Sequence, residues 1–81
     1  LSGRIGENVL EYEPSRALFG GNRGMEMISE ILRQIPHFLK PEGVLYIEHE
    51  PEQAVEIQKL LPGIISEKDQ FDIVRYSIFH K

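Results

Sequence analysis

The sequence contains no cysteine, no tryptophan, no long apolar stretch and no run of basic residues. Without cysteine, neither a disulfide framework nor a thiolate metal site can form, and a reducing compartment is favoured. No segment approaches the roughly 18 apolar residues that cross a bilayer, and no basic segment followed by an apolar core resembles a signal peptide. We therefore expect a cytoplasmic protein that does not associate with membranes.

The charged residues are mostly acidic and widely spread. Nine Lys and Arg residues stand against 13 Asp and Glu residues, which gives a net charge of −4. Nucleic-acid binding requires clustered cations that neutralise phosphates, so this class of function is disfavoured. With 81 residues, 41% of them hydrophobic, the chain suffices for one small globular domain. The opening segment begins at Leu1 without periodicity, which suggests a chain cut from a longer protein.

The apolar pattern predicts the order loop-α-β-α-β-β. Residues 1–23 show no sustained period and are expected to form a long ordered loop, with one helical turn near residues 14–18. Residues 24–39 carry apolar side chains at helical spacing, with Asn22 as candidate N-cap and Pro36 shortening or kinking the last turn. A strand at Val44–Glu48, a helix at residues 51–61 and two strands at residues 64–68 and 73–80 follow.

This order predicts an α/β fold with a mixed sheet that ends in an antiparallel hairpin. The uninterrupted apolar strand Val44–Glu48 is expected to be buried on both faces, as in a parallel sheet. We assign residues 1–81 to one portion of a single domain, in which residues 24–81 form the αβαββ unit.

Three segments resemble HemK-type methyltransferases, which modify glutamine in peptide chain release factors. Residues 12–24 read YEPSRALFGGNRG and resemble the family's YEPxxALxGGxxG segment. Residues 40–49 (KPEGVLYIEH) are similar to its LKPGGxLxxEHG stretch, and residues 53–55 (QAV) to its GxAV helix start. The resemblance implies a C-terminal part of a class I fold that uses S-adenosylmethionine, with Val44–Glu48 as its fifth strand. Residues 73–80 would lie antiparallel between the fifth and sixth strands.

The chain departs from this family at two decisive motifs. It has neither the Gly-rich turn that binds S-adenosylmethionine nor the Asn-Pro-Pro-Tyr motif that holds the substrate amide. Glu50 stands where the family has Gly, and residues 69–74 lack its usual Gly- and Arg-containing turn. We therefore expect the parent to methylate a release factor, and the isolated chain to be inactive and to bind no cofactor.

The resemblance implies that the segment around Glu13 and Pro14 lies beside the catalytic loop. Glu13 could accept a hydrogen bond from a substrate amide or from the loop, or it could cap the short turn that follows. The residues expected to support the substrate pocket are Glu13, Pro14, Ala17 and Leu18. None is expected to be catalytic, and none to bind the cofactor or a metal.

Other candidates have simpler structural explanations. Glu48, His49, Glu50 and Glu52 follow a strand and could line a ligand crevice or bind a metal, but solvated acids at a helix start fit their spacing better. Gly20 and Gly21 lack the strand–turn–helix context of a phosphate loop and are assigned to a turn. Met25, Met27 and Ile28 are expected to pack in the core. His37 and His80 are expected to lie at the ends of a helix and a strand, without a chemical role.

A non-enzymatic alternative stays open. Val44–Glu48 would normally pair with a fourth strand that is missing here, so its edge is expected to be open and apolar. Two copies of the chain could pair through this edge, or through the exposed face of the helix at residues 24–39. The chain would then be a self-associating remnant or interaction module.

Overall fold

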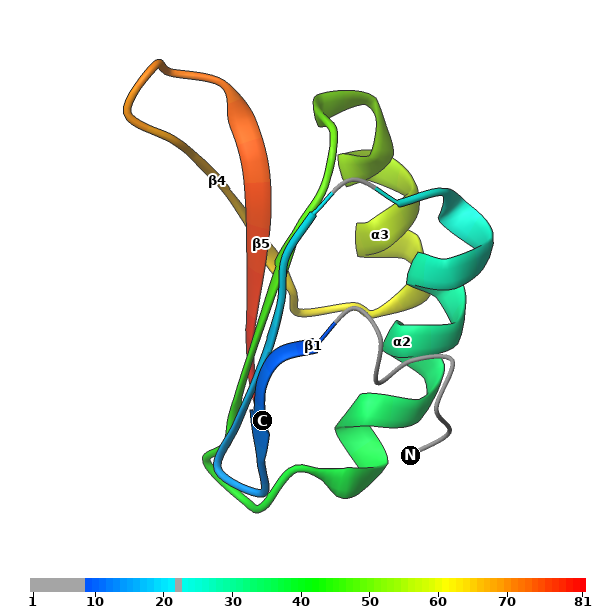
Figure 1. Ribbon diagram of the computed structural model, residues 1–81. Helices are drawn as coiled ribbons and strands as arrows, with labels where there is room; N and C mark the ends of the chain where they lie inside the picture. The colour runs from blue at the N-terminus through cyan, green and yellow to red at the C-terminus, as the bar shows by residue number, and fades with distance from the viewer. Residues whose placement is uncertain (1–8, 22) are drawn as a thin grey trace.

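The computed structural model describes residues 9–21 and 23–81, and it shows a sheet with two helices on one face (Figure 1). None of the helices in the described part is long and apolar enough to cross a membrane. The elements in chain order are β1 (Val9–Glu13), β2 (Arg16–Phe19), α2 (Met25–Phe38), β3 (Val44–Glu48), the 3₁₀ turn η1 (Pro51–Gln53), α3 (Ala54–Leu60), β4 (Ile65–Lys68) and β5 (Val74–His80).

The first two strands form a hairpin where a loop was expected. Glu13 pairs with Arg16, so Pro14 and Ser15 make the turn between β1 and β2. The expected loop and its helical turn are therefore wrong from Val9 to Phe19; residues 1–8 lie outside the described part. β2 has the alternating burial of a half-covered strand, with Ala17 and Phe19 buried. Four residues are too few for this period to be recognised in the sequence.

The sheet has the order β1-β2-β3-β5-β4 and is mixed, as predicted. β2 and β3 are parallel, while β5 runs antiparallel to both β3 and β4. The expectation of an open edge on β3 is wrong, because β2 pairs with that edge from Val44 to Ile47. The position of β5 between β3 and β4 matches the order that the family resemblance implied.

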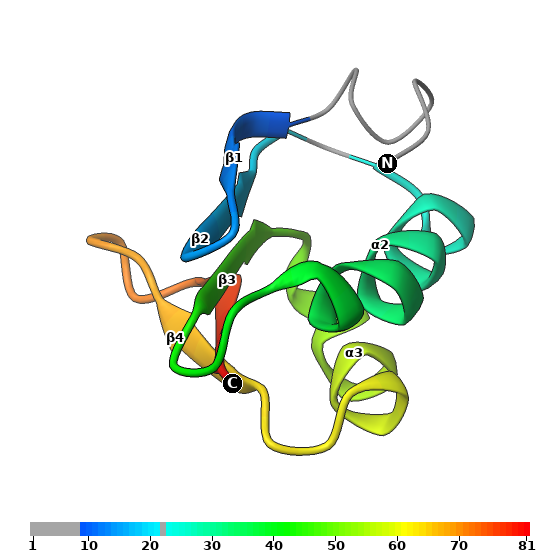
Figure 2. The same ribbon diagram turned by 90° about the horizontal axis from the view of Figure 1, so that it is seen from below.

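In the described part of the chain, both helices lie on the same face of the sheet (Figure 2). On β3, Leu45 and Ile47 are fully buried, whereas Val44, Tyr46 and Glu48 are only half-buried. The expectation that this strand is buried on both faces is therefore wrong for the chain as it stands. The half-buried residues point to the face that no described element covers.

Helix α2 confirms the predicted helix and contributes more buried residues to the core than any other described element. Ile28, Ile31, Leu32 and Ile35 form one buried stripe, which packs with Phe19, Leu45 and Ile47 from the sheet and Ile57 from α3. Gly24 is the N-cap, whereas the predicted cap, Asn22, lies outside the described residues. Pro36 sits in the last turn, where the helix ends at Phe38.

The far end of the chain closes the fold at the C-terminus of α2. The Lys81 ammonium donates to the carbonyl oxygens of Pro36 and Leu39, at 2.5 and 2.8 Å. These carbonyls carry the negative end of the helix dipole, so a cation there is stabilising. The predicted second helix and the closing β4–β5 hairpin are likewise confirmed.

Candidate functional site

The segment proposed to support the substrate pocket forms the β1–β2 turn and the start of β2. Glu13 is exposed, and its carboxylate accepts a hydrogen bond from the Ser15 hydroxyl at 2.6 Å. The same carboxylate lies 3.9 Å from the Arg16 guanidinium. The Pro14 carbonyl accepts the Lys40 N–H at 2.6 Å, which ties the hairpin to the turn before β3. Ala17 is buried in the core, whereas Leu18 lies on the other face, beside Tyr46 in register.

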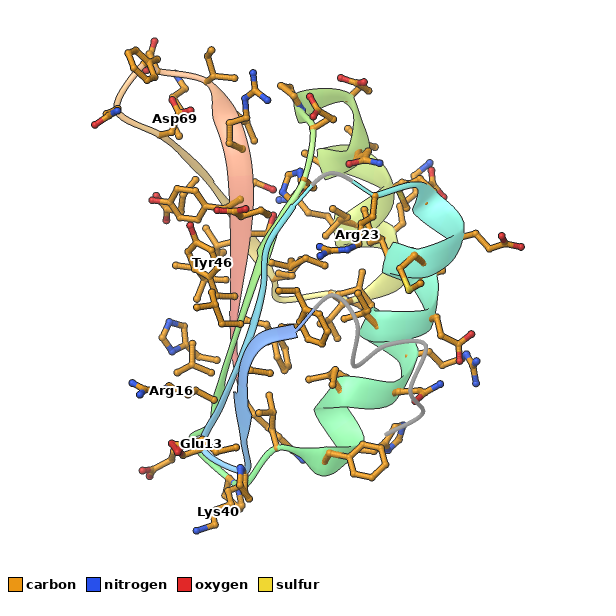
Figure 3. All side chains as sticks on the ribbon, in the orientation of Figure 1. Glu13, Arg16, Arg23, Lys40, Tyr46 and Asp69 are labelled. Carbon is orange, nitrogen blue, oxygen red and sulfur yellow. The ribbon has the colours of Figure 1, made fainter. Side chains whose placement is uncertain are left out.

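These four residues do not converge on one cavity. Successive strand residues point to opposite faces, so Ala17 and Leu18 cannot line the same recess. Glu13 and Lys40 lie at the amino ends of β2 and β3, and Asp69 lies at the opposite end of the sheet (Figure 3). Ligand crevices in such sheets open at the carboxyl ends of parallel strands. Glu13 and Pro14 are therefore positioned to hold the hairpin rather than to face that crevice.

The carboxyl end of β3 borders a recess of about 550 Å³ between β3 and the β4–β5 hairpin. Three carboxylates, three aromatic rings and one guanidinium contribute to its lining, which consists of Gly21, Tyr46, Glu48, His49, Glu50, Asp69, Phe71, Ile73, Arg75 and Tyr76. The sequence singled out residues 48–50 because they end a strand. It gave no sign of residues 69–76, because only the register of the hairpin brings them here.

His49 is buried and forms a hydrogen-bonded chain. Its Nδ1 lies 2.8 Å from the Glu50 carbonyl and its Nε2 2.7 Å from Ser77 Oγ. A carbonyl can only accept, so Nδ1 carries the proton in the neutral ring and Nε2 accepts from Ser77. Ser66 Oγ, 2.9 Å from Ser77 Oγ, then donates to Ser77. His49 thus joins the end of β3 to β5 and β4, which is a structural role.

Glu50 begins the next helical segment through a capping box. Its backbone N–H donates to the Gln53 side-chain oxygen at 2.8 Å, while its own carboxylate caps the turn. The Gln53 amide also donates to the Arg23 carbonyl at 2.9 Å. One Glu50 oxygen lies 3.3 Å from Arg75 Nη1, in a partly exposed ion pair that bridges β3 and β5. Glu50, which stands where the resemblance leads one to expect Gly, therefore has a side chain that both caps the turn and pairs with Arg75.

The Gly-rich connection between β2 and α2 corrects one expectation. Gly20 and Gly21 do lie between a strand and a helix, and Gly21 has a φ of 94°, which favours glycine. The Gly21 N–H donates to Glu48 Oε1 at 2.9 Å. A carboxylate of the chain itself thus takes the amide that would otherwise meet a phosphate, and its charge repels an anion.

Arg23 belongs to this connection, and its side chain lies between the sheet and α2 (Figure 3). It is buried, donates to the Gly20 carbonyl and stands 5.9 Å from the centre of the Phe19 ring. Burial lowers the pKa of Arg23, and the negative charge of Glu48 partly offsets that shift. The buried guanidinium therefore organises the β2–α2 connection from the core side.

Tyr46 and Tyr76 stack on the face of the sheet that carries no helix, with ring centres 4.9 Å apart. Burial, with the charges of Glu48 and Tyr76, raises the pKa of Tyr46 above its ordinary value. Its hydroxyl therefore stays protonated at neutral pH and can donate a hydrogen bond.

Two features of the described residues bear on the binding of a metal or a cofactor: the acidic side chains and the Gly-rich turn. Within residues 9–21 and 23–81, no three His, Asp or Glu side chains converge as metal ligands. The Gly-rich turn of this part of the chain is bonded to Glu48, so it does not fit the Gly-rich cofactor turn that the family uses. We therefore derive no catalytic step from these residues.

Curated proteins match the chain over about 70% of its length. The release factor glutamine methyltransferase of Francisella tularensis is 43% identical over 56 residues, which are 69% of this chain and 20% of that protein. Those of Yersinia pestis and Pseudomonas aeruginosa are 39% and 35% identical over 57 residues, 70% of this chain and 21% of each protein. No protein-family model and no solved structure matches. The match thus spans about a fifth of these relatives' length, and the resemblance to this family is confirmed.

Proposed function

We propose that this chain is the C-terminal portion of a methyltransferase related to the release factor glutamine methyltransferases. The whole protein would transfer a methyl group from S-adenosylmethionine to the side-chain amide nitrogen of a release factor glutamine. The observation that carries the proposal is the identity of 31–43% to several such enzymes over about 70% of the chain. A cytoplasmic location is part of the same proposal.

The sheet order supports a class I methyltransferase fold. The strands β3, β5 and β4 are neighbours in that order, with β5 antiparallel to both others. This is the arrangement that the resemblance implied for the fifth, seventh and sixth strands. Residues 24–81 would be the αβαββ end of one catalytic domain, to which the β1–β2 hairpin is added.

The uncovered face of the sheet supports the view that this is part of a larger domain. Leu18, Val44, Tyr46 and Ile78 lie half-buried on strands whose opposite sides face the helices. Parallel strands joined through a helix occur almost always in sheets that are covered on both faces. The remaining part of the enzyme would supply that second cover.

The contribution of this portion to catalysis would be positioning. In the transfer step, the substrate amide nitrogen must lie in line with the cofactor methyl group, and correct placement supplies much of the rate. We propose that Glu13, Pro14, Ala17 and Leu18 support the substrate pocket by fixing the β1–β2 hairpin, without touching substrate. The chain alone would lack cofactor binding and activity.

A chimaera tests this function directly. In the Yersinia pestis relative, the segment that matches this chain is replaced by the corresponding segment of this chain. Methylation of a release factor glutamine is then measured by mass spectrometry. We expect the chimaera to methylate, and an Ile47→Asp chimaera to lose activity, since Ile47 is fully buried in the core.

The matched control is Val55→Asp, because Val55 is 63% exposed on α3. This chimaera is expected to keep its activity. A folded chimaera without activity, alongside an active parent, would refute the proposal.

The alternative is a non-enzymatic module that self-associates as a homodimer. The half-buried apolar face of the sheet favours it, because a second copy could cover that face. The open edge of β3 no longer supports it, since β2 occupies that edge. A monomeric mass at high concentration would exclude this alternative.

A further inference from the structure

The recess at the carboxyl end of β3 combines aromatic rings with carboxylates. The exposed ring of Phe71, 71% accessible, stands at the tip of the β4–β5 hairpin. The stacked pair of Tyr46 and Tyr76 forms the floor beside it. A second recess of about 480 Å³, on the Lys68 and Ile78 side, shares Tyr46, Tyr76, Phe71 and Asp69. The aromatic residues therefore lie where the two recesses meet.

The charge of the larger recess is negative. Its lining has three carboxylates, those of Glu48, Glu50 and Asp69, and a single guanidinium, that of Arg75. Arg75 is paired with Glu50 at 3.3 Å, and Arg23 faces Glu48 from the core side. Asp69 Oδ1 accepts the N–H groups of Phe71 and Ile73, at 2.8 and 3.1 Å. These N–H donors fix the orientation of the carboxylate without cancelling its charge.

The exposure of Phe71 has no explanation in the fold. It contributes nothing to the core, and it stands in a turn whose Asp72 has a φ of 65°. Asp69 holds that turn through backbone hydrogen bonds, so the ring is presented on a defined support. Aromatic side chains, Phe among them, are enriched at protein interfaces relative to the rest of the surface.

We propose that this recess docks a basic peptide segment, with a Lys or Arg side chain between Phe71 and the tyrosine pair. The faces of aromatic rings attract cations, and Glu48 and Asp69 add charge complementarity. The volume of about 550 Å³ accommodates one long side chain and its flanking backbone. The inference goes beyond methyl transfer, needs neither cofactor nor activity, and applies to the chain in which the Tyr46 face of the sheet is open.

The test is a titration of the 81-residue chain, followed through its backbone amide NMR signals. The probe is a blocked five-residue peptide with one arginine and one lysine between glycines. The control peptide carries citrulline and acetyl-lysine in their places. We expect saturable shifts confined to residues 46–50 and 69–76, weaker at high salt, and no such shifts with the control peptide.

Two variants and two matched controls sharpen the test. Phe71→Ala removes an exposed ring, and Glu48→Gln removes a charge but keeps an acceptor for Gly21. Each should weaken binding by about threefold to tenfold, the effect of one cation–π or charge contact at a partly exposed site. Phe38→Ala, at the end of α2, and Glu56→Gln, on α3, remove an exposed ring and an exposed carboxylate charge elsewhere on the chain. They should leave binding unchanged.

Equal binding of the neutral peptide would overturn the proposal, as would shifts outside the recess or none at millimolar peptide. Failure here would leave the methyltransferase assignment intact, because the chimaera measures catalysis and this titration measures docking.

Discussion

At the scale of single residues, the hydrogen-bonded chain of His49, Ser77 and Ser66 links three strands at the candidate site. Ser77 is fully buried and bonds to both neighbours, at 2.7 and 2.9 Å. A buried polar group that loses its partner keeps the full cost of its desolvation. The chain therefore couples the end of β3 to the closing hairpin.

Ser77→Ala should lower the free energy of unfolding by about 1–3 kcal/mol, because it leaves the His49 Nε2 buried without its donor. Urea denaturation followed by circular dichroism measures this difference. The control is Ser15→Ala at the exposed β1–β2 turn, expected to change stability by less than about 0.5 kcal/mol. Equal stability of Ser77→Ala and the unaltered chain would show that His49 finds another partner.

Ionisation of the Tyr46 phenol makes the stability of the folded chain depend on pH in the alkaline range. Its pKa in the folded state is raised, by burial first and then by Glu48 and Tyr76, from an ordinary value of 10.0. Below pH 10 the phenol is protonated in both states, so its contribution to stability is fully present. In the unfolded chain Tyr46 ionises first, near its ordinary pKa. As the pH rises through the raised pKa of the folded state, the contribution of Tyr46 to stability is lost.

A difference titration between the unaltered chain and Tyr46→Phe, read at the tyrosinate absorbance band, isolates this phenol. We expect its midpoint above pH 10, and we expect Tyr76→Phe to move it downward by removing one cause of the shift. A Tyr46 midpoint at or below pH 10 in the unaltered chain would contradict the packing described here.

At the scale of elements, the β1–β2 hairpin depends on the turn between α2 and β3. The Lys40 N–H donates to the Pro14 carbonyl, and the Val44 N–H donates to the Ser15 carbonyl at 3.0 Å. A Cβ built on Gly43 would lie 2.9 Å from the Lys40 carbonyl oxygen and 3.3 Å from that of Pro14. Only glycine lets the two turns approach this closely.

Gly43→Ala should therefore destabilise the chain by about 1–3 kcal/mol, the usual cost of overpacking against groups that cannot move away. Thermal unfolding provides the measurement. In the control, Gly24→Ala, the added methyl group meets nothing within 4 Å. Its cost should stay near 1 kcal/mol or less, as expected for an N-cap position. A tolerated Gly43→Ala would mean that the hairpin is not held at this turn.

The elements also show what local patterns can and cannot predict. Helix α2 can be recognised from the helical spacing of its apolar residues, and strands β3 and β5 from their short runs of apolar, β-branched and aromatic residues. The strand β2 is only four residues long and is stabilised by pairing with β3, 28 positions further along the chain. Likewise, Glu48 and Glu50 could be named as residues at a strand end, but their meeting with Asp69 and Arg75 depends on hairpin register. Such non-local pairing leaves no periodic signal.

At the scale of the whole molecule, the chain is an α/β layer with one covered face. The core between the sheet and the two helices is closed, while Leu18, Tyr46 and Ile78 remain half-buried opposite them. The chain matches about a fifth of the length of its relatives. A sheet with one uncovered face is consistent with such a portion of a larger fold. Both support the proposal that the chain is a folded portion of a methyltransferase.

The most direct test of this view is calorimetric titration of S-adenosylmethionine into the 81-residue chain, with the sedimentation mass recorded on the same sample. We expect this titration to show no heat of binding. A dimeric mass in that sample would show that a second copy covers the open face of the sheet, and a monomeric mass would show that the single layer is stable alone. Binding at micromolar cofactor would contradict the account, since it would place a cofactor seat within these residues.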